Sequence, residues 1–173
     1  MIYNDDEGDG VARAYGIPST VFKMRLDAIH PKYVTFLHEC LHALGLRHTH
    51  EFDNTGEIYS TTSGDLVGDT PAICPLTELV GPDCELVQNW KAIRMARHEH
   101  EVLRSNPMGN LDSLNTYQRQ AAMRNIMAYT YKPCRTHLTD EQIGRIFYTI
   151  LTTTELRETI HEYRKGFLFK VNY

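Results

Sequence analysis

Residues 38–48 constrain this chain more than any other stretch, because they read H-E-x-x-H-x-x-G-x-x-H. His38 and His42 are four residues apart, so on a helix they share one face and can bind the same metal ion. Gly45 is expected to end that helix, since glycine adopts positive φ without a Cβ penalty. The chain can then return His48 to the first two histidines as a third ligand.

The three predicted nitrogen ligands leave a fourth coordination position open, which is typical of a catalytic zinc site rather than a structural one. Glu39 adjoins the first ligand and is close enough to reach a water molecule at the metal. For this composition, a chance match to the whole string has a probability on the order of one in ten thousand. The alternative is a helix with two exposed histidines and a glycine cap.

Bulk properties exclude several classes of function. A chain of 173 residues is long enough for one domain with its own core. A net charge of −4 gives no indication of a nucleic-acid partner. No apolar run approaches the ~18 residues of a membrane span. The acidic N-terminus lacks the apolar region of a signal peptide, which leaves an intracellular protein or a chain without its secretion segment.

The four cysteines form no C-x-x-C pair, so a structural zinc site made of four cysteines is not expected. Cys40 lies inside the zinc-binding stretch, off the face of the histidines, and is interpreted as a small buried apolar residue. Among Cys74, Cys84 and Cys134, one disulfide and one unpaired cysteine are expected. The residue pattern alone does not choose the pairing.

Hydrophobic spacing predicts the main elements. Residues 11–24 have the pattern of one or two short strands around a turn, with Pro18 suited to an edge strand. A helix is predicted from Pro31 to Leu44, with its core face at Val34, Leu37, Leu41 and Leu44. Residues 1–10 are expected to be a loose acidic segment and residues 49–84 mostly loop.

Two further helices are predicted toward the C-terminus. Residues 85–105 have an amphipathic pattern, with Leu86, Trp90, Ile93 and Val102 near one face. Thr139-Asp140-Glu141-Gln142 is a capping box. The helix that follows is expected to face the core through Ile143, Ile146, Phe147, Ile150 and Leu151. Neither an internal repeat nor a linker is visible, so residues 1–173 are interpreted as a single domain.

Several segments together resemble the pappalysin branch of the metzincin metallopeptidases. The string of residues 38–48, followed by a Met-turn at Asn125-x-Met127-x-Tyr129, matches the metzincin signature. The segment Gly64-Asp65-x-Val67-x-Asp69-Thr70-Pro71-Ala72, Cys134 and the Thr-x-x-Gln capped helix narrow the resemblance to that branch. The resemblance covers residues 31–150.

The resemblance implies an α+β, zincin/metzincin-like fold. Its upper subdomain, about residues 1–47, would carry a small sheet and the active-site helix. Its lower subdomain, about residues 48–173, would be loop-rich and end in a C-terminal helix. The implied activity is that of a secreted, monomeric zinc endopeptidase acting on protein or peptide substrates. Zinc would bind His38, His42 and His48, and Glu39 would be the general base.

Further roles follow only from this resemblance. Met127 would form an apolar floor under the metal, and Tyr129 would approach the metal or the oxyanion of the transition state. A disulfide would join Cys134 to either Cys74 or Cys84. Calcium is implied in the lower subdomain, with Asp65, Asp69 and Thr70 as ligands.

Two features depart from the family pattern. Only 30 residues precede Pro31, so a short upper sheet is expected, and residues 85–124 have the length of an insertion that narrows the cleft or binds a partner. Substrate backbone is expected to pair with a strand edge at Val11–Ile17. The alternative function is a catalytically inactive zinc-binding interaction protein, against which Glu39 argues. A zinc deaminase is excluded, because H-x-E and P-C-x-x-C do not occur.

Overall fold

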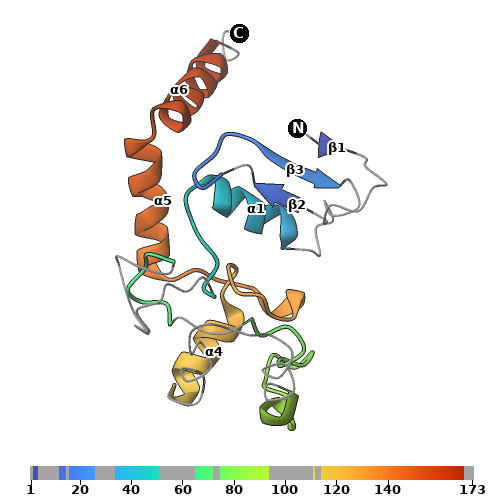
Figure 1. Cartoon of the computed structure of the whole chain (residues 1–173). Coiled ribbons are helices and arrows are strands. Elements are labelled where there is room, and N and C mark those ends of the chain that lie inside the picture. Colours follow the sequence, from blue (N-terminus) through green and yellow to red (C-terminus); the bar gives the residue numbers. More distant parts are fainter. Residues whose placement is uncertain are drawn as a thin grey trace.

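The computed structural model is mainly helical with one small sheet, compatible with the α+β expectation. It describes residues 2–3, 12–14, 16–25, 34–50, 65–71, 75–93, 111 and 114–169. Pro31, Cys74 and most of the helix expected over 85–105 lie outside these ranges. Figure 1 shows the sheet and α1 above α4, with α5 on the other side of α1 from the sheet and α6 extending beyond α5.

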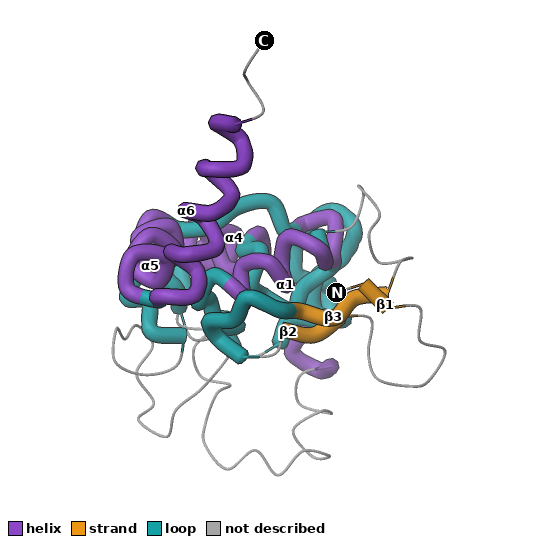
Figure 2. Tube along the Cα trace, turned by 90° about the horizontal axis from the view of Figure 1, so that it is seen from above, coloured by secondary structure: helices purple, strands orange, loops and turns teal. Residues whose placement is uncertain are grey.

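The sheet has three short strands in the order β1-β3-β2, and Figure 2 shows them side by side. β2 (Ala12–Ala14) runs antiparallel to β3 (Phe22–Arg25), which confirms the predicted strands around a turn. β1 (Ile2–Tyr3) pairs parallel with β3. The expectation of a loose N-terminal segment was wrong for these two residues, because Ile and Tyr favour strands and find a partner in β3.

Helix α1 (Thr35–Ala43) packs against β2 and β3 and ends as predicted at Gly45. The φ of Gly45 is 95°, its N–H donates to His42 O at 2.9 Å, and the N–H of Leu46 donates to Leu41 O at 3.0 Å. These two bonds define a Schellman motif with glycine at the left-handed position. The chain therefore reverses within two residues of the helix end.

The buried face of α1 differs from the expected one. Leu37 is 46% exposed, so the prediction that it faces the core was wrong. The buried residues of the helix are instead His38, Glu39, Leu41, His42 and Ala43. Residues that follow α1 in the chain cover its histidines, since Ile126 O lies 2.8 Å from His38 Nδ1, whereas Phe36 contacts Phe22 of β3 with ring centres 5.8 Å apart.

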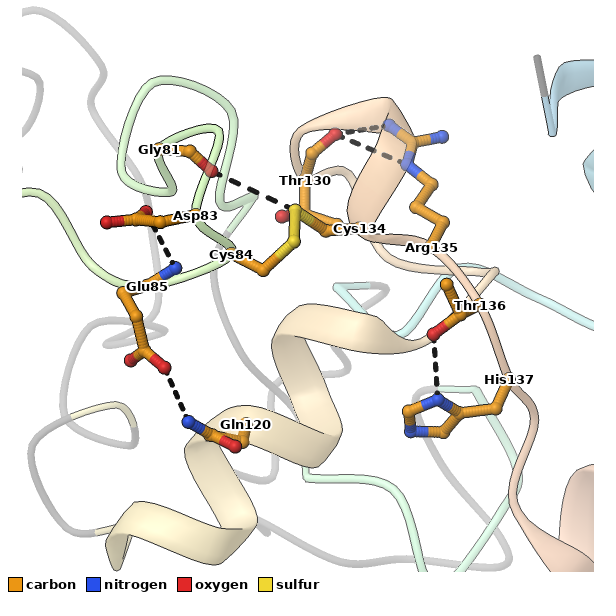
Figure 3. The surroundings of a disulfide bond; sticks show 10 residues. All are labelled: Gly81, Asp83, Cys84, Glu85, Gln120, Thr130, Cys134, Arg135, Thr136 and His137. Atoms are coloured by element: carbon orange, nitrogen blue, oxygen red, sulfur yellow. Dashed lines mark hydrogen bonds between the residues drawn. A yellow bond between two sulfur atoms is a disulfide. The ribbon is translucent and has the colours of Figure 1, made fainter. Parts of the chain in front are cut away.

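Helix α4 (Thr116–Arg124) and the neighbouring loops contribute to a hydrophobic core away from the sheet. Its buried residues are Leu76, Leu79, Val80, Leu111, Leu114, Ala122, Met123 and Cys134. A disulfide joins Cys84 to Cys134 in the 3₁₀ helix η2 (Lys132–Cys134), which confirms one of the two pairings implied by the resemblance (Figure 3). Leu86 forms an isolated bridge with Val80, so it was wrongly placed in a helix. Helical structure begins at Trp90 and is described as far as Ile93.

Helix α5 (Asp140–Thr152) begins with the predicted capping box of Thr139 and Gln142, and α6 (Thr154–Phe169) follows it. Ile146 packs on the apolar cluster of Leu41, Leu46, Ile126 and Met127, as expected. The remainder of the predicted core face was largely wrong, since Ile143, Phe147 and Leu151 are 42%, 62% and 67% exposed. No helix among the described residues is both long and apolar enough to cross a lipid bilayer.

Candidate metal centre

The three predicted ligand histidines converge on one point. His48 Nε2 lies 2.9 Å from His42 Nε2 and 3.2 Å from His38 Nε2. One potential ligand atom from each of the three residues lies within 4.8 Å of the others. Within the described ranges, no other group of three or more His, Cys, Asp or Glu residues has this geometry. Three histidines so placed can hold a metal ion.

Backbone carbonyls fix which ring nitrogen faces the centre. His38 Nδ1 lies 2.8 Å from Ile126 O, and His42 Nδ1 lies 2.7 Å from Leu46 O. A carbonyl oxygen only accepts, so each Nδ1 carries the proton and each Nε2 presents its lone pair. A single proton on His48 can satisfy only one of the two lone pairs. The three Nε2 atoms therefore fit a cation as their shared partner. The hydrogen bonds from Nδ1 to backbone carbonyls are of the kind that metal-binding histidines make with their second ring nitrogen.

Burial keeps the imidazoles of His38 and His48 neutral. Burial, assisted by neighbouring histidines and Arg135, lowers the pKa of His38 to about 4, although its hydrogen bond to Ile126 opposes the shift. The pKa of His48 is lowered to about 2, again mainly by burial. Both residues are thus neutral at pH 7, which is the form that binds metals.

Glu39 follows His38 on α1 and is 7% exposed. The adjacent Cys40 is unpaired and half-buried, rather than fully buried as expected. Burial and the neighbouring Glu39 raise the pKa of the Cys40 thiol. Cys40 is not among the residues whose ligand atoms converge here, which leaves the three histidines as the ligands of this centre.

The Asn125–Ala128 turn contacts the histidines through its backbone. The N–H of Ala128 donates to Asn125 O at 3.2 Å, and Ile126 supplies the carbonyl that orients His38. Met127 is fully buried in an apolar cluster with Leu41 and Leu46, which flank the ligands in the chain. The sequence located this turn through Met127, but it carried no signal for the contact between Ile126 O and His38.

A buried pair of amides joins this turn to α5. Asn125 Nδ2 donates to Gln142 Oε1 at 2.8 Å, and Gln142 Nε2 donates to Asn125 Oδ1 at 3.2 Å. Asn125 Oδ1 also accepts the N–H of Met127 at 2.9 Å. Asn125 and Gln142 are 2% and 1% exposed. The same glutamine completes the capping box of α5, so the helix start and the turn are positioned together.

Aromatic rings line one side of the centre. The ring centre of Tyr129 lies 4.6 Å from that of His48 and 6.0 Å from that of His38. His50, which sequence reasoning did not select, stacks on His48 at 4.7 Å and lies 4.5 Å from Tyr129. Its position two residues after the third ligand was the available signal. Arg135 lies over the Tyr129 ring, with Cζ 5.7 Å from the ring centre.

The residues implied as calcium ligands make hydrogen bonds within the protein. Asp69 accepts from Thr139 Oγ1 at 2.6 Å and from the N–H of Glu141 at 3.0 Å, which places its charge at the start of α5. Asp65 accepts from the Val67 N–H at 3.2 Å and from Thr70 Oγ1 at 2.5 Å. These contacts give the carboxylates a structural role, and calcium binding stays a prediction.

Comparison with models of known protein families finds no match to this chain, and comparison with characterised proteins finds none either. The residues of the site and their geometry are therefore the basis on which a function is proposed.

Proposed function

We propose that this chain is a zinc-dependent endopeptidase of the metzincin type, similar to the pappalysins. The observation that carries the proposal is the convergence of the Nε2 atoms of His38, His42 and His48, with Glu39 buried directly after His38 on α1. A purely structural zinc site has no use for a neighbouring base. The sheet with α1 and the loop-rich part with α5 would be the upper and lower subdomains of one catalytic domain.

The reaction divides among a few side chains. A zinc ion bound by the three histidines supplies Lewis-acid chemistry, which acidifies water and polarises a carbonyl group. Glu39 accepts the proton of the attacking water and passes it to the leaving amine. Tyr129 lies beside His48 and is partly exposed, so its hydroxyl is the proposed donor to the oxyanion. Met127 forms the apolar floor.

The edge of the sheet is the proposed binding surface for the substrate backbone. β2 lies at one end of the strand order and packs on α1, which carries two of the ligands. An extended peptide can add to such an edge through main-chain hydrogen bonds. Ala12→Pro would remove one backbone N–H from that edge region, and an unchanged KM for peptides would count against this docking mode.

The test of the peptidase proposal compares Glu39→Gln with the wild type. Both proteins are loaded with zinc and incubated with casein. We expect one zinc ion in each and cleavage only by the wild type, with cleavage lost on chelation and restored by zinc. Glu158→Gln on the exposed face of α6 is the matched control and should cleave normally. Zinc binding without cleavage by any of the three proteins would favour the inactive interaction protein.

Secretion is part of the proposal. The Cys84–Cys134 disulfide joins two segments that are 50 residues apart. Disulfides of this kind persist in oxidising compartments, so the bond favours an extracellular location.

A further inference from the structure

Arg135 lies next to the disulfide and reaches toward the metal centre. Its Nε and Nη2 atoms both donate to Thr130 O, at 3.2 and 2.9 Å. Figure 3 shows the guanidinium turned back on this carbonyl, with its third nitrogen pointing away from the loop. The face of the group lies over Tyr129. The geometry thus fixes one edge of the guanidinium and, within the described part of the chain, leaves the other edge available to a ligand.

The charge of Arg135 lacks a counter-ion among the described residues. Its contacts there are a neutral carbonyl and an aromatic ring, and no carboxylate pairs with it. The side chain is half-buried, and burial lowers its pKa. A half-buried cation is stabilised by an anionic partner. The nearby histidines are neutral, and a metal ion among them would add further positive charge.

The guanidinium is close enough to contact a peptide at the metal centre. Tyr129 separates it from His48, so Cζ lies no more than about 10 Å from the His48 ring, which is the length of about three residues of extended chain. Planar guanidinium groups bind carboxylates through two parallel hydrogen bonds when one whole edge is free, and through a single charge-assisted bond otherwise.

We propose that Arg135 binds a carboxylate of the substrate and so selects peptides with negative charge within about three residues of the scissile bond. This inference rests on the proposed peptidase function. The carboxylate has two possible sources, an Asp or Glu side chain and the C-terminus of the peptide.

The test uses a peptide from casein that the zinc-loaded wild type cleaves, made with a blocked C-terminus. Gln is compared with Glu at each of the three positions on either side of the cleaved bond. A charge-assisted hydrogen bond predicts that Glu raises kcat/KM about 10- to 100-fold at one position. In Arg135→Gln this ratio should fall to about 1, and Arg135→Lys should retain part of it. Because the ratio is taken within each protein, general losses of folding or zinc cancel.

Arg119→Gln is the matched control. Arg119 is also half-buried and donates its Nε to a carbonyl five residues earlier, Leu114 O at 2.9 Å. It contacts none of the residues of the metal centre. The control should keep the wild-type ratio of Glu to Gln peptides. An equal loss of the ratio in both variants would overturn the proposal.

A second arm separates the two sources of the carboxylate. The same peptides are also made with a free C-terminus that lies within three residues of the cleaved bond, and their kcat/KM is compared with that of the blocked peptides. A C-terminal carboxylate is identified as the ligand if only the free C-terminus raises kcat/KM in a way that depends on Arg135. In the wild type, a ratio of about 1 for Glu over Gln together with a ratio of about 1 for the free over the blocked C-terminus would overturn the inference and leave the peptidase proposal intact.

A binding measurement makes the inference independent of turnover. Fluorescently labelled Glu and Gln peptides are titrated with zinc-loaded Glu39→Gln, with and without Arg135→Gln. Tighter binding of the Glu peptide that depends on Arg135 supports the inference even if the wild type cleaves nothing. Equal binding of both peptides, with a free or a blocked C-terminus, overturns it.

Discussion

Replacing Gly45 by alanine should destabilise the protein at the point where α1 turns toward His48. A Cβ built on Gly45 would lie 3.0 Å from Thr149 Cβ and closer still to the Oγ1 and Cγ2 atoms of that residue. The φ of 95° adds strain for any residue with a Cβ, of about 1–2 kcal/mol. Overpacking against α5 adds about 1–3 kcal/mol. The expected loss of unfolding free energy is therefore about 2–5 kcal/mol.

Gly144→Ala is the matched control, because a Cβ at Gly144 would meet no atom within 4 Å. It lies inside α5, so alanine should stabilise the protein by about 1 kcal/mol. Urea denaturation of the metal-free proteins measures both changes. Gly45→Ala should also weaken zinc binding, because Leu46 O orients His42.

The double mutant Gly45→Ala/Thr149→Ala separates the two causes of the loss. Removing Oγ1 and Cγ2 of Thr149 should recover the overpacking share and leave the backbone strain, which gives a coupling energy of about 1 kcal/mol or more. A Gly45→Ala variant within about 0.5 kcal/mol of the wild type, or additive single mutants, would refute this reasoning.

Three other variants test the supports of the centre. Gln142→Leu leaves the buried Asn125 amide without its partner and should lower the free energy of unfolding, measured by urea denaturation, by about 1–3 kcal/mol. Gln118→Leu, which disrupts the exposed capping box of α4, should lower it by about 1 kcal/mol or less. Equal losses would contradict the role of the amide pair. Cys84→Ser/Cys134→Ser should lower the free energy of unfolding by about 4 kcal/mol, because the disulfide closes a loop between residues 50 apart. An unchanged midpoint of thermal unfolding would argue against this contribution. Tyr129→Phe keeps the ring beside His48 and should leave zinc affinity unchanged while kcat falls about 100-fold; wild-type kcat would remove Tyr129 from the oxyanion site.

Local chemistry made part of this structure predictable. Gly45 ends α1 because the Schellman motif needs a residue at positive φ, and Thr139 begins α5 because its side chain and that of Gln142 pair with the first free N–H groups. Both signals lie within a few adjacent residues. The four-residue spacing of His38 and His42 is equally local, so the sequence was sufficient to place two ligands together.

Contacts between distant segments were not predictable in the same way. The carbonyl of Ile126 orients His38 from 88 residues away, and a backbone group leaves no pattern in a sequence. The apolar stripe of α5 indicated a helix but not the face that would be covered. Gly45 allows α5 to approach α1 through Thr149, and this contact leaves Phe147 on the exposed side.

The most direct test of the account is the coordination of zinc in the purified protein. Metal analysis should give one zinc ion per chain. X-ray absorption should show three nitrogens at about 2.0–2.1 Å and one light-atom ligand from solvent, with no sulfur. His42→Ala should lose the metal, whereas Cys40→Ser should keep it unchanged. A zinc ion with a sulfur ligand, or a wild-type chain that binds no zinc, would contradict the three-histidine centre on which the proposed function depends.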